Sequence, residues 1–378
     1  MASFLGNLFG KSERRVVGID IGSSAIKVVE LYTSGGRVFL GTYGSIPLGP
    51  YADVEIGKAT NLSVEKTQEA LQKVLDESGV IAKEAAVNIP FNSSLVSVIR
   101  LPKASEKRLD QIVPTEARKY IPANLDEVRL DWSVIEAKSN VPFDNKEELD
   151  SKNKDSQEPK NPAMEQIDIL LAAIHNDSLE RHSSIVGKTS LKVSFFEIEV
   201  FSTSRALSSI NSEAPVAVVD IGASSSKIYI LDGGMMRFSH TINLGSQDAT
   251  IAISRVMDIS DEEAEMVKRD IGIEGSYVHL QEALDEVFER LFSDVLKVIR
   301  IYEKKNSCNL ERVVISGGGG CLKGIRKIAQ ERLDKSISVV NPFDRVKHPP
   351  FMKEILARVG PEYAAAAGVA MRAAGVQR

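Results

Sequence analysis

Apolar and polar residues follow the same order in two segments of this chain that lie 200 positions apart. Residues 16–31 read VVGIDIGSSAIKVVEL, and residues 216–231 read VAVVDIGASSSKIYIL. In each segment, two apolar runs flank a short turn of Gly and Ser residues, which predicts two β-strands joined by a tight turn. Seven of the sixteen positions are identical. Because each copy opens about half of the 378 residues, the repeat predicts two related halves.

The remaining hydrophobic pattern predicts alternating strands and helices. Pro114 lies inside one helical pattern, so we expect a kink or a break there. Ser260 and Glu263 form a capping-box pattern, which starts a helix that runs to about residue 270. Further strands are predicted at 37–43, 85–89, 95–101, 131–135, 167–174, 192–198 and 312–315. Other helices are predicted at 63–78, 106–120, near 202–209, 280–304, from about 322, and at 361–374.

Two segments of the chain depart from this regular pattern. Residues 138–166 are polar and charged, and they carry too few apolar residues to offset the entropy of ordering, so we expect a mobile surface loop. Residues 1–15 hold four large apolar residues before a basic cluster, and we expect a flexible leader. No stretch of the sequence approaches the roughly 18 apolar residues that a membrane-spanning helix needs.

The composition of the chain is that of a globular protein, with 43% hydrophobic and 26% charged residues. A net charge of −5 argues against a broad nucleic-acid-binding surface. Cys308 and Cys321 follow no metal-binding spacing, and we interpret them as ordinary thiols in a reducing compartment.

The repeated turn has the chemistry of an anion site. Gly22 lets the backbone approach a ligand closely, and successive N–H groups in a tight turn form a concavity that attracts anions. Ser23 and Ser24 add hydroxyl donors. Asp20 ends an apolar strand, where a carboxylate needs a cationic partner, and hydrated Mg²⁺ on a phosphate is a suitable one. The two copies therefore predict two half-sites that face one polyphosphate.

A run of four glycines at 317–320 follows the strand predicted at 312–315. Without side chains, this segment could lie against a flat base or ribose. The run does not match the G-x-G-x-x-G pattern, and no Walker A pattern occurs in the chain. On its own, the glycine run is weak evidence for a ligand site. It becomes good evidence because it follows the two repeated turns in the chain.

Taken together, the two turns and the glycine run are similar to the phosphate and adenosine motifs of the actin/Hsp70/sugar-kinase superfamily. Within it, the chain resembles the PilM family of type IV pilus assembly and, more distantly, the FtsA family of cell division. The segments that carry the resemblance are LGNLFGKSERRVVGIDIGSSAIKVVEL, RLPKASEKRLDQIVPTEARKYIPANLDEVRLDWSVI, ISDEEAEMVKR and GPEYAAAAGVAMRAA. The resemblance spans the chain except for residues 138–166.

This resemblance implies an α/β fold of two actin-like (ribonuclease H-like) domains with duplicated mixed sheets. The first domain would cover 16–214 and include an FtsA/PilM-type inserted subdomain at about 92–188. The second domain would cover 215–378 and include a subdomain at about 246–304.

The resemblance also implies a role for each matching residue in binding ATP or ADP. The first phosphate element comprises Asp20, Gly22, Ser23, Ser24 and Lys27. The second comprises Asp220, Gly222, Ala223, Ser224 and Lys227. The adenosine loop comprises Gly317, Gly318, Gly319 and Gly320, and the positions that contact ribose or base are Glu265 and Lys268. Asp20 and Asp220 would hold Mg²⁺ through water. For Glu265 and Lys268, a plain surface ion pair is an equal alternative to contact with the ribose or base.

The candidate catalytic residue is Glu199. The superfamily often has a Glu-Pro before a helix that positions water or Mg²⁺, but this chain has Val200 in place of the proline. Glu197 lies two positions earlier, and on a strand both carboxylates would face the same side. Ser246 also replaces a glycine that the family often has. These departures predict at most slow ATP hydrolysis.

For function, the resemblance implies a nucleotide-loaded cytoplasmic adaptor of the inner-membrane pilus platform. Its partner would be the N-terminal tail of a PilN-like inner-membrane protein, bound to a groove within about 80–190. Other platform proteins and a second copy of the chain are further expected partners, and the chain would lie peripherally at the cytoplasmic face of the inner membrane. A slow ATPase or small-molecule kinase and an FtsA-like filament protein are the alternatives.

Overall fold

The computed structural model describes residues 13–104, 106–135, 166–207, 214–274 and 278–376. The leader expected at 1–15 and the mobile loop expected at 138–166 lie almost entirely outside the described residues. None of the helices in the described part of the chain is long and apolar enough to cross a membrane.

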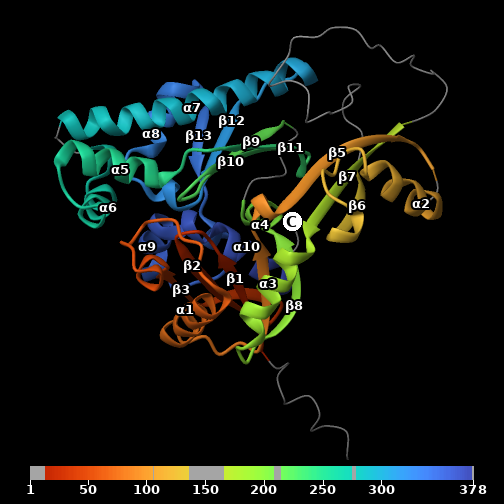
Figure 1. Cartoon of the computed structure of the whole chain (residues 1–378), viewed down its shortest axis with the longest axis horizontal. Helices are drawn as coiled ribbons and strands as arrows, with labels where there is room; N and C mark the ends of the chain where they lie inside the picture. The colour runs from red at the N-terminus through yellow and green to blue at the C-terminus, as the bar shows by residue number, and fades with distance from the viewer. Residues whose placement is uncertain (1–12, 105, 136–165, 208–213, 275–277, 377–378) are drawn as a thin grey trace, which may run out of the picture.

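The first half is built on a five-stranded sheet in the order β3-β2-β1-β4-β8 (Figure 1). Strands β1, β2 and β3 are antiparallel, whereas β4 and β8 run parallel to β1. Alternate residues of β1 face opposite sides, so Val17 and Ile19 pack under helices α1 and α3. The bounds are β1 (Arg14–Ile21), β2 (Ala25–Ser34), β3 (Arg37–Pro47), α1 (Val64–Glu77), β4 (Glu84–Ile89), α3 (Asn176–Gly187) and β8 (Lys192–Ile198).

The second half repeats this sheet strand for strand, in the order β11-β10-β9-β12-β13. Strands β9 and β10 take the places of β1 and β2, so the duplication predicted from the repeat is confirmed. Helices α5 to α8 cover one face of this sheet, and α7 runs along the top of the molecule in Figure 1. The strands are β9 (Val216–Ile221), β10 (Ser226–Asp232), β11 (Met235–Ile242), β12 (Arg312–Ser316) and β13 (Ser336–Val339). The helices are α5 (Ser246–Met257), α6 (Asp261–Asp270), α7 (Val278–Asn306) and α8 (Ile325–Leu333).

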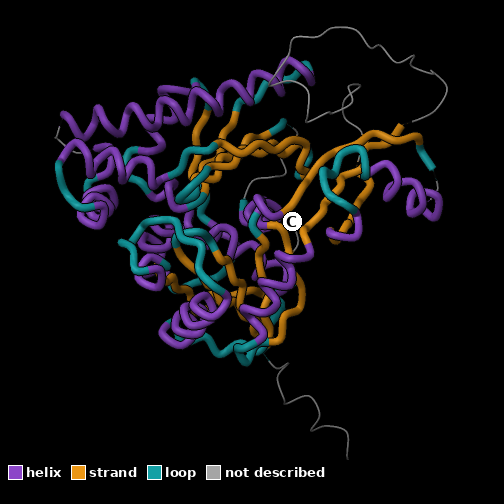
Figure 2. The backbone as a smooth tube through the Cα atoms, viewed as in Figure 1, coloured by secondary structure: helices purple, strands orange, loops and turns teal. Residues whose placement is uncertain are grey.

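A third, three-stranded sheet is inserted between β4 and β8 and projects to one side of the two larger sheets (Figure 2). Its order is β5-β7-β6, and all its strands are antiparallel. Helix α2 packs on this sheet through Leu109, Val113 and Ala117. The bounds are β5 (Ser94–Pro102), α2 (Glu106–Ala117), β6 (Val128–Ile135) and β7 (Gln166–His175).

Helix α10 (Ala364–Ala373) returns from the second half to cover the first sheet. It packs against β1, β2, β4 and helix α4 (Glu199–Ala206), and helix α9 (Lys353–Val359) precedes it. The approach is very close: a Cβ atom on Gly18 would lie 2.1 Å from the carbonyl oxygen of Ala366, and one on Gly368 would lie 1.8 Å from that of Ser202. The run of alanines near the chain end is therefore a packing surface.

Two predicted elements need correction. Of the kink or break expected at Pro114, the break is wrong, because α2 continues through Pro114 to Ala117. The lost N–H bond would have gone to Asp110, which is exposed, so water can satisfy that carbonyl. The short helix expected near 202–209 begins earlier, at Glu199.

Candidate functional site

The two repeated turns have the same backbone geometry. The N–H of Gly22 donates to the carbonyl of Ala25 at 3.0 Å, and the N–H of Gly222 donates to that of Ser225 at 3.1 Å. A Cβ on Gly222 would lie 2.7 Å from the Ser225 carbonyl oxygen, so this turn needs glycine for the close approach. The repeated sequence is thus a repeated local structure.

The register of each hairpin pairs an aspartate with a lysine. Asp20 lies opposite Lys27 across β1 and β2, and Asp220 lies opposite Lys227 across β9 and β10. Directly opposite residues of an antiparallel pair have side chains on the same face. The spacing of seven residues between Asp and Lys, seen in both copies, therefore places a carboxylate beside an ammonium at the base of each turn.

The two turns face one another across the boundary between the halves. The hydroxyl oxygens of Ser23 and Ser224 are 3.4 Å apart. The hollow that they enclose has a volume of about 80 Å³, smaller than the roughly 300–1,000 Å³ of ordinary ligand pockets, so the halves must separate to admit a polyphosphate. It is lined by Asp20, Gly22, Ser23, Ser24, Lys27, Glu199, Thr203, Asp220, Gly222, Ala223, Ser224, Ser225, Lys227, Ser316, Gly317, Gly318, Pro361, Glu362 and Ala365.

The glycine run contributes two of its four residues to this hollow. Gly317 has φ 81°, and a Cβ there would lie 2.3 Å from Asp220 Oδ1, so glycine is required on both counts. Gly318 also lines the hollow, and nothing would meet a Cβ on it within 4 Å.

The other two glycines serve packing. A Cβ on Gly319 would lie 2.3 Å from the side chain of Ile221, and one on Gly320 would lie 3.0 Å from that of Pro361. Both are buried. Sequence reasoning grouped all four glycines, whereas the structure brings only the first two to the cleft.

Ser316 comes directly before the glycine run, at the end of β12. It is buried and lines the hollow, and its Oγ has no hydrogen-bond partner among the described residues. A buried hydroxyl without a partner is costly, so Ser316 is suited to bind a polar ligand group in the cleft.

Glu199 begins helix α4 and points into the cleft. Its Oε1 accepts a hydrogen bond from the N–H of Phe91 at 2.7 Å, and it lies 3.1 Å from the Nζ of Lys227. Lys227 belongs to the second half, so this ion pair joins the two halves. Its side chains are 12% and 14% exposed, which makes it a well-shielded contact.

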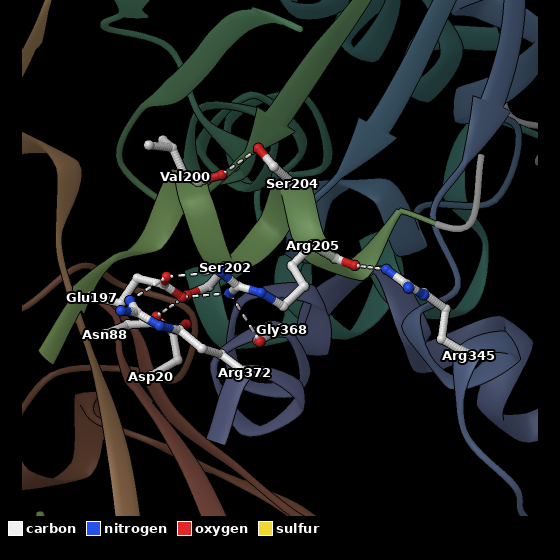
Figure 3. Close-up of polar contacts among 10 residues, drawn as sticks. All are labelled: Asp20, Asn88, Glu197, Val200, Ser202, Ser204, Arg205, Arg345, Gly368 and Arg372. Carbon is white, nitrogen blue, oxygen red and sulfur yellow. Dashed lines mark hydrogen bonds and ion pairs between the residues drawn. The ribbon is translucent and has the colours of Figure 1, made fainter. Parts of the chain in front are cut away.

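Glu197 points elsewhere, contrary to the expectation that it shares a side with Glu199. Strand β8 ends at Ile198, and the change to helix turns the two carboxylates apart. Glu197 accepts two hydrogen bonds from Arg205, at 2.6 and 3.0 Å, and one from Arg372 at 2.7 Å (Figure 3). Arg205 belongs to α4 and Arg372 to α10, so the hydrogen bonds to Glu197 connect both helices to β8.

A chain of polar contacts connects this cluster to the cleft (Figure 3). The Oγ of Ser202 lies 2.6 Å from Glu197 Oε2 and 2.7 Å from Asn88 Oδ1. The amide of Asn88 donates to Asp20 Oδ1 at 3.4 Å. Asn88 therefore holds the first aspartate in place, and sequence reasoning missed it. The available signal was a polar residue within the apolar strand at 84–89.

The charged groups of the cleft shift one another's pKa values. Burial raises the pKa of the Asp20 carboxyl to about 6, and the charge of Glu199 adds to the rise. Burial also raises the pKa of Asp220, although Lys227 opposes this. Burial lowers the pKa of Lys227, but attraction to Glu199 and Asp220 outweighs it and holds that pKa above its ordinary value. Lys227 is therefore a fixed positive charge at neutral pH.

Glu265 and Lys268, predicted to contact ribose or base, lie outside this hollow. They share a face of α6, as their spacing implies, and form a buried ion pair at 2.5 Å. Lys268 also donates to Thr250 at 2.7 Å and to the carbonyl of Ser246 at 3.0 Å. The ribose-contact role stays a prediction, since these groups satisfy one another.

A segment of the first half, residues 55–60, crosses to the second half beside this pair. Lys58 pairs with Asp261 at 3.0 Å, and the N–H of Ala59 donates to Gln247 Oε1 at 3.0 Å. Gly57, with φ 93°, packs against Glu265, where a Cβ would lie 2.9 Å from the carboxyl carbon. Nothing in the sequence pattern indicated this crossing, which adds to the contacts that hold the halves together.

A second hollow, of about 580 Å³, opens where the inserted sheet joins the first half. Apolar residues such as Leu48, Leu62 and Ile185 form part of it, and Asn92 and Arg181 are among its polar groups. It shares Gly22, Ser23, Ser224, Ser225, Glu199 and Lys227 with the first hollow. The pair of Glu199 and Lys227 thus lies in the wall between them.

Replacing Glu197 by glutamine is expected to cost about 2 kcal/mol of unfolding free energy at neutral pH, because an uncharged amide then replaces the carboxylate that pairs with Arg205 and Arg372. Burial would raise the pKa of Glu197, but its bonds to Arg205, and then Ser202 and Arg372, hold it below the ordinary 4.5. The stabilisation is therefore present above pH 4.5 and is lost as pH falls through the lower folded-state pKa. Urea unfolding across pH should show the two proteins converging in acid, and a constant difference would contradict this account.

Comparison with known proteins places the chain in a family. A family model described as type IV pilus assembly protein PilM matches residues 18–160 and 135–374. Among curated proteins, the cell division protein FtsA of Bacillus subtilis (strain 168) is 25% identical over 173 residues. That match covers 39% of each protein, so the chain spans well under half the length of this relative.

Solved structures show the fold. A PilM–PilN type IV pilus biogenesis complex superimposes with a TM-score of 0.77 and 24% identity, over 95% of this chain and 98% of the other. The ethanolamine utilization protein EutJ of Carboxydothermus hydrogenoformans gives 0.54 and 15%, over 94% and 89% of the two chains. A chain of the MamK double helical filament gives 0.50 and 14%, over 97% and 100%. The predicted actin-like α/β fold with duplicated mixed sheets is confirmed.

Proposed function

The chain belongs to the family of type IV pilus assembly proteins PilM, and we propose that it is the nucleotide-binding cytoplasmic adaptor of a pilus assembly platform. A nucleotide binds between the halves, and the N-terminal tail of a PilN-like inner-membrane protein binds beside it. The observation that carries the proposal is the pair of matched turns that face one another in a chain of this family.

Several features of the cleft support nucleotide binding. Each turn brings serine hydroxyls to the hollow beside a glycine, and Lys27, which lies opposite Asp20, lines the hollow without a salt bridge to another described residue. Gly317 lets the backbone pass directly over Asp220, and Ser316 offers a buried hydroxyl that lacks a partner in the described chain. Together these groups suit a phosphate chain with a polar ribose beside it.

The hollow of about 580 Å³ is the proposed peptide groove. Part of its lining comes from the connections β4–β5 and β7–α3 and from α3, which belong to the predicted segment 80–190, and the rest comes from residues 21–67 and from the cleft. Apolar side chains such as Leu62 and Ile185 suit aliphatic residues of a tail, and Asn92 and Ser93 suit its backbone. Because this partner is a membrane protein, it would hold the chain at the cytoplasmic face of the inner membrane. Other platform proteins and a second copy of the chain are further proposed partners.

The proposed ATPase activity is slow at most. Glu199 remains the candidate catalytic residue, but its Oε1 is already engaged by the N–H of Phe91 and by Lys227. A carboxylate held in this way is poorly placed to activate a water molecule. The same engagement argues against a kinase, which needs a free general base near its substrate.

Thermal unfolding with ATP and with a synthetic N-terminal PilN-like peptide tests both parts of the proposal. A ligand that binds only the folded chain stabilises it by about 2.7 kcal/mol at roughly 100 times its Kd, so each should raise the Tm. Absence of any shift with ATP would refute the nucleotide site, and absence of any shift with the peptide would refute the groove.

Replacing Asn92 by tryptophan is expected to weaken peptide binding more than about tenfold, because the indole fills the groove. Asn92 is exposed, so the variant should fold and should still respond to ATP. Ile81→Trp is the matched control, since Ile81 is 61% exposed and lies outside the groove. Fluorescence anisotropy of a labelled peptide measures the effect, and equal affinities for the two variants would place the peptide elsewhere.

A further inference from the structure

The two lysines of the cleft occupy equivalent positions in the two hairpins but have different partners. Lys227 lies 3.1 Å from Glu199, and its side chain is 14% exposed. Lys27, in contrast, lies opposite Asp20 and interacts electrostatically with Asp20 and Asp220, but its ammonium forms no salt bridge with a residue in the described part of the chain. The sequence repeat alone predicts equal roles for the two lysines, so this difference is a property of the folded chain.

Lys227 lies among the carboxylates of the cleft. Asp220 is opposite it in the ladder, Glu199 pairs with it, and Asp20 lines the same hollow and interacts electrostatically with it. These three carboxylates include both of the residues predicted to hold Mg²⁺. In the described residues, no group of three or more acidic, histidine or cysteine side chains has the arrangement of a metal site.

A compact ammonium and a hydrated Mg²⁺ ion compete for such a position. Each interacts favourably with the same carboxylates, and the two cations repel each other at short range. Mg²⁺ also demands near-octahedral oxygen ligands, whereas an ammonium accepts the irregular set that is present here.

We propose that Lys227 is the resident cation of this cleft: its ammonium takes the place among Asp20, Asp220 and Glu199 that a divalent ion would take. Lys27, the equivalent residue of the first hairpin, is then the lysine that binds the phosphates of the nucleotide. This inference rests on the proposed nucleotide function. Its consequence is that nucleotide affinity depends little on Mg²⁺.

Titration calorimetry with ATP, in excess Mg²⁺ and in excess EDTA, tests the inference on the full chain. For the wild type, the Kd should change less than about threefold between the two conditions. For Lys227→Met, the Kd should become more than about tenfold tighter with Mg²⁺ than with EDTA. Lys27→Met is the matched control, and it should weaken binding in both conditions alike. A wild-type protein that binds ATP only with Mg²⁺ would overturn the inference.

A second measurement needs no nucleotide. Electron paramagnetic resonance of Mn²⁺ should detect binding to Lys227→Met but not to the wild type, because removal of the ammonium leaves the carboxylates free to rearrange around the metal ion. Lys227→Arg keeps the charge and should behave as the wild type. Equal Mn²⁺ binding by the wild type and Lys227→Met would overturn the inference. If ATP fails to bind under every condition, the proposed nucleotide-binding function is refuted. The Mn²⁺ measurement still tests whether Lys227 occupies the cation position.

Discussion

Replacing Ser224 by glutamate is expected to abolish nucleotide binding while the chain still folds. Ser224 is exposed at the tip of the second turn, 3.4 Å from the hydroxyl of Ser23. A carboxylate there would face a bound phosphate at about 4 Å, where two unit charges repel by about 4 kcal/mol at an effective dielectric constant of 20. Since 1.4 kcal/mol is a factor of ten, one such repulsion weakens binding by roughly a thousandfold.

The measurement is the rise in Tm on adding ATP, compared between the wild type, Ser224→Glu and Ser224→Ala. The alanine variant loses one hydroxyl and no charge, so it should keep most of the shift. The unliganded Tm of the three proteins should agree closely, because the side chain is exposed. A full ATP shift in Ser224→Glu would show that the phosphates do not lie between the turns.

Replacing Gly368 by valine is expected to destabilise the chain by more than about 3 kcal/mol, because the new side chain overpacks a buried contact. A Cβ at this position would lie 1.8 Å from the carbonyl oxygen of Ser202. That oxygen is main chain and cannot rotate away, so α10 and α4 would have to separate. Separation would also strain the contacts of Glu197 with Arg205 and Arg372, which hold the same helices.

Urea unfolding followed by circular dichroism measures this effect. Gly187→Ala is the matched control, because Gly187 is exposed near the end of α3 and nothing would meet its Cβ within 4 Å. It should be as stable as the wild type or slightly more stable, since alanine favours helix. A Gly368→Val protein of unchanged stability would mean that α10 does not pack as closely as described.

The features that sequence alone could predict are those decided by near neighbours. The repeated turns follow from Asp, Gly and Ser at fixed spacing, and both form as expected. The capping box at the start of α6 is confirmed, with Glu263 N–H donating to Ser260 Oγ at 3.2 Å and Ser260 N–H donating to Glu263 Oε2 at 3.0 Å. Each of these needs only a few consecutive residues.

The features that could not be predicted depend on partners distant in the chain. The face of Glu197 was misjudged because the switch from strand to helix at residue 199 is fixed by packing of α4 on α10. Gly319 and Gly320 serve contacts with Ile221 and Pro361, which no local pattern shows. The environment of Lys268 depends on Thr250, 18 residues away. In each case a neighbour in space, absent from the local sequence, decides the role.

The return of α10 to the first sheet has a consequence for biosynthesis. Strands β1, β2 and β4 are made early, yet the helix that covers one of their faces consists of residues 364–373. A ribosome must therefore translate nearly all of the second half before the first half can bury that apolar face. The second half contains its own sheet and the covering helices α5 to α8, so it can fold first although it is translated after the first half. Exposed apolar strands on a nascent chain favour aggregation, so we expect this face of the first sheet to need protection until α10 has been translated.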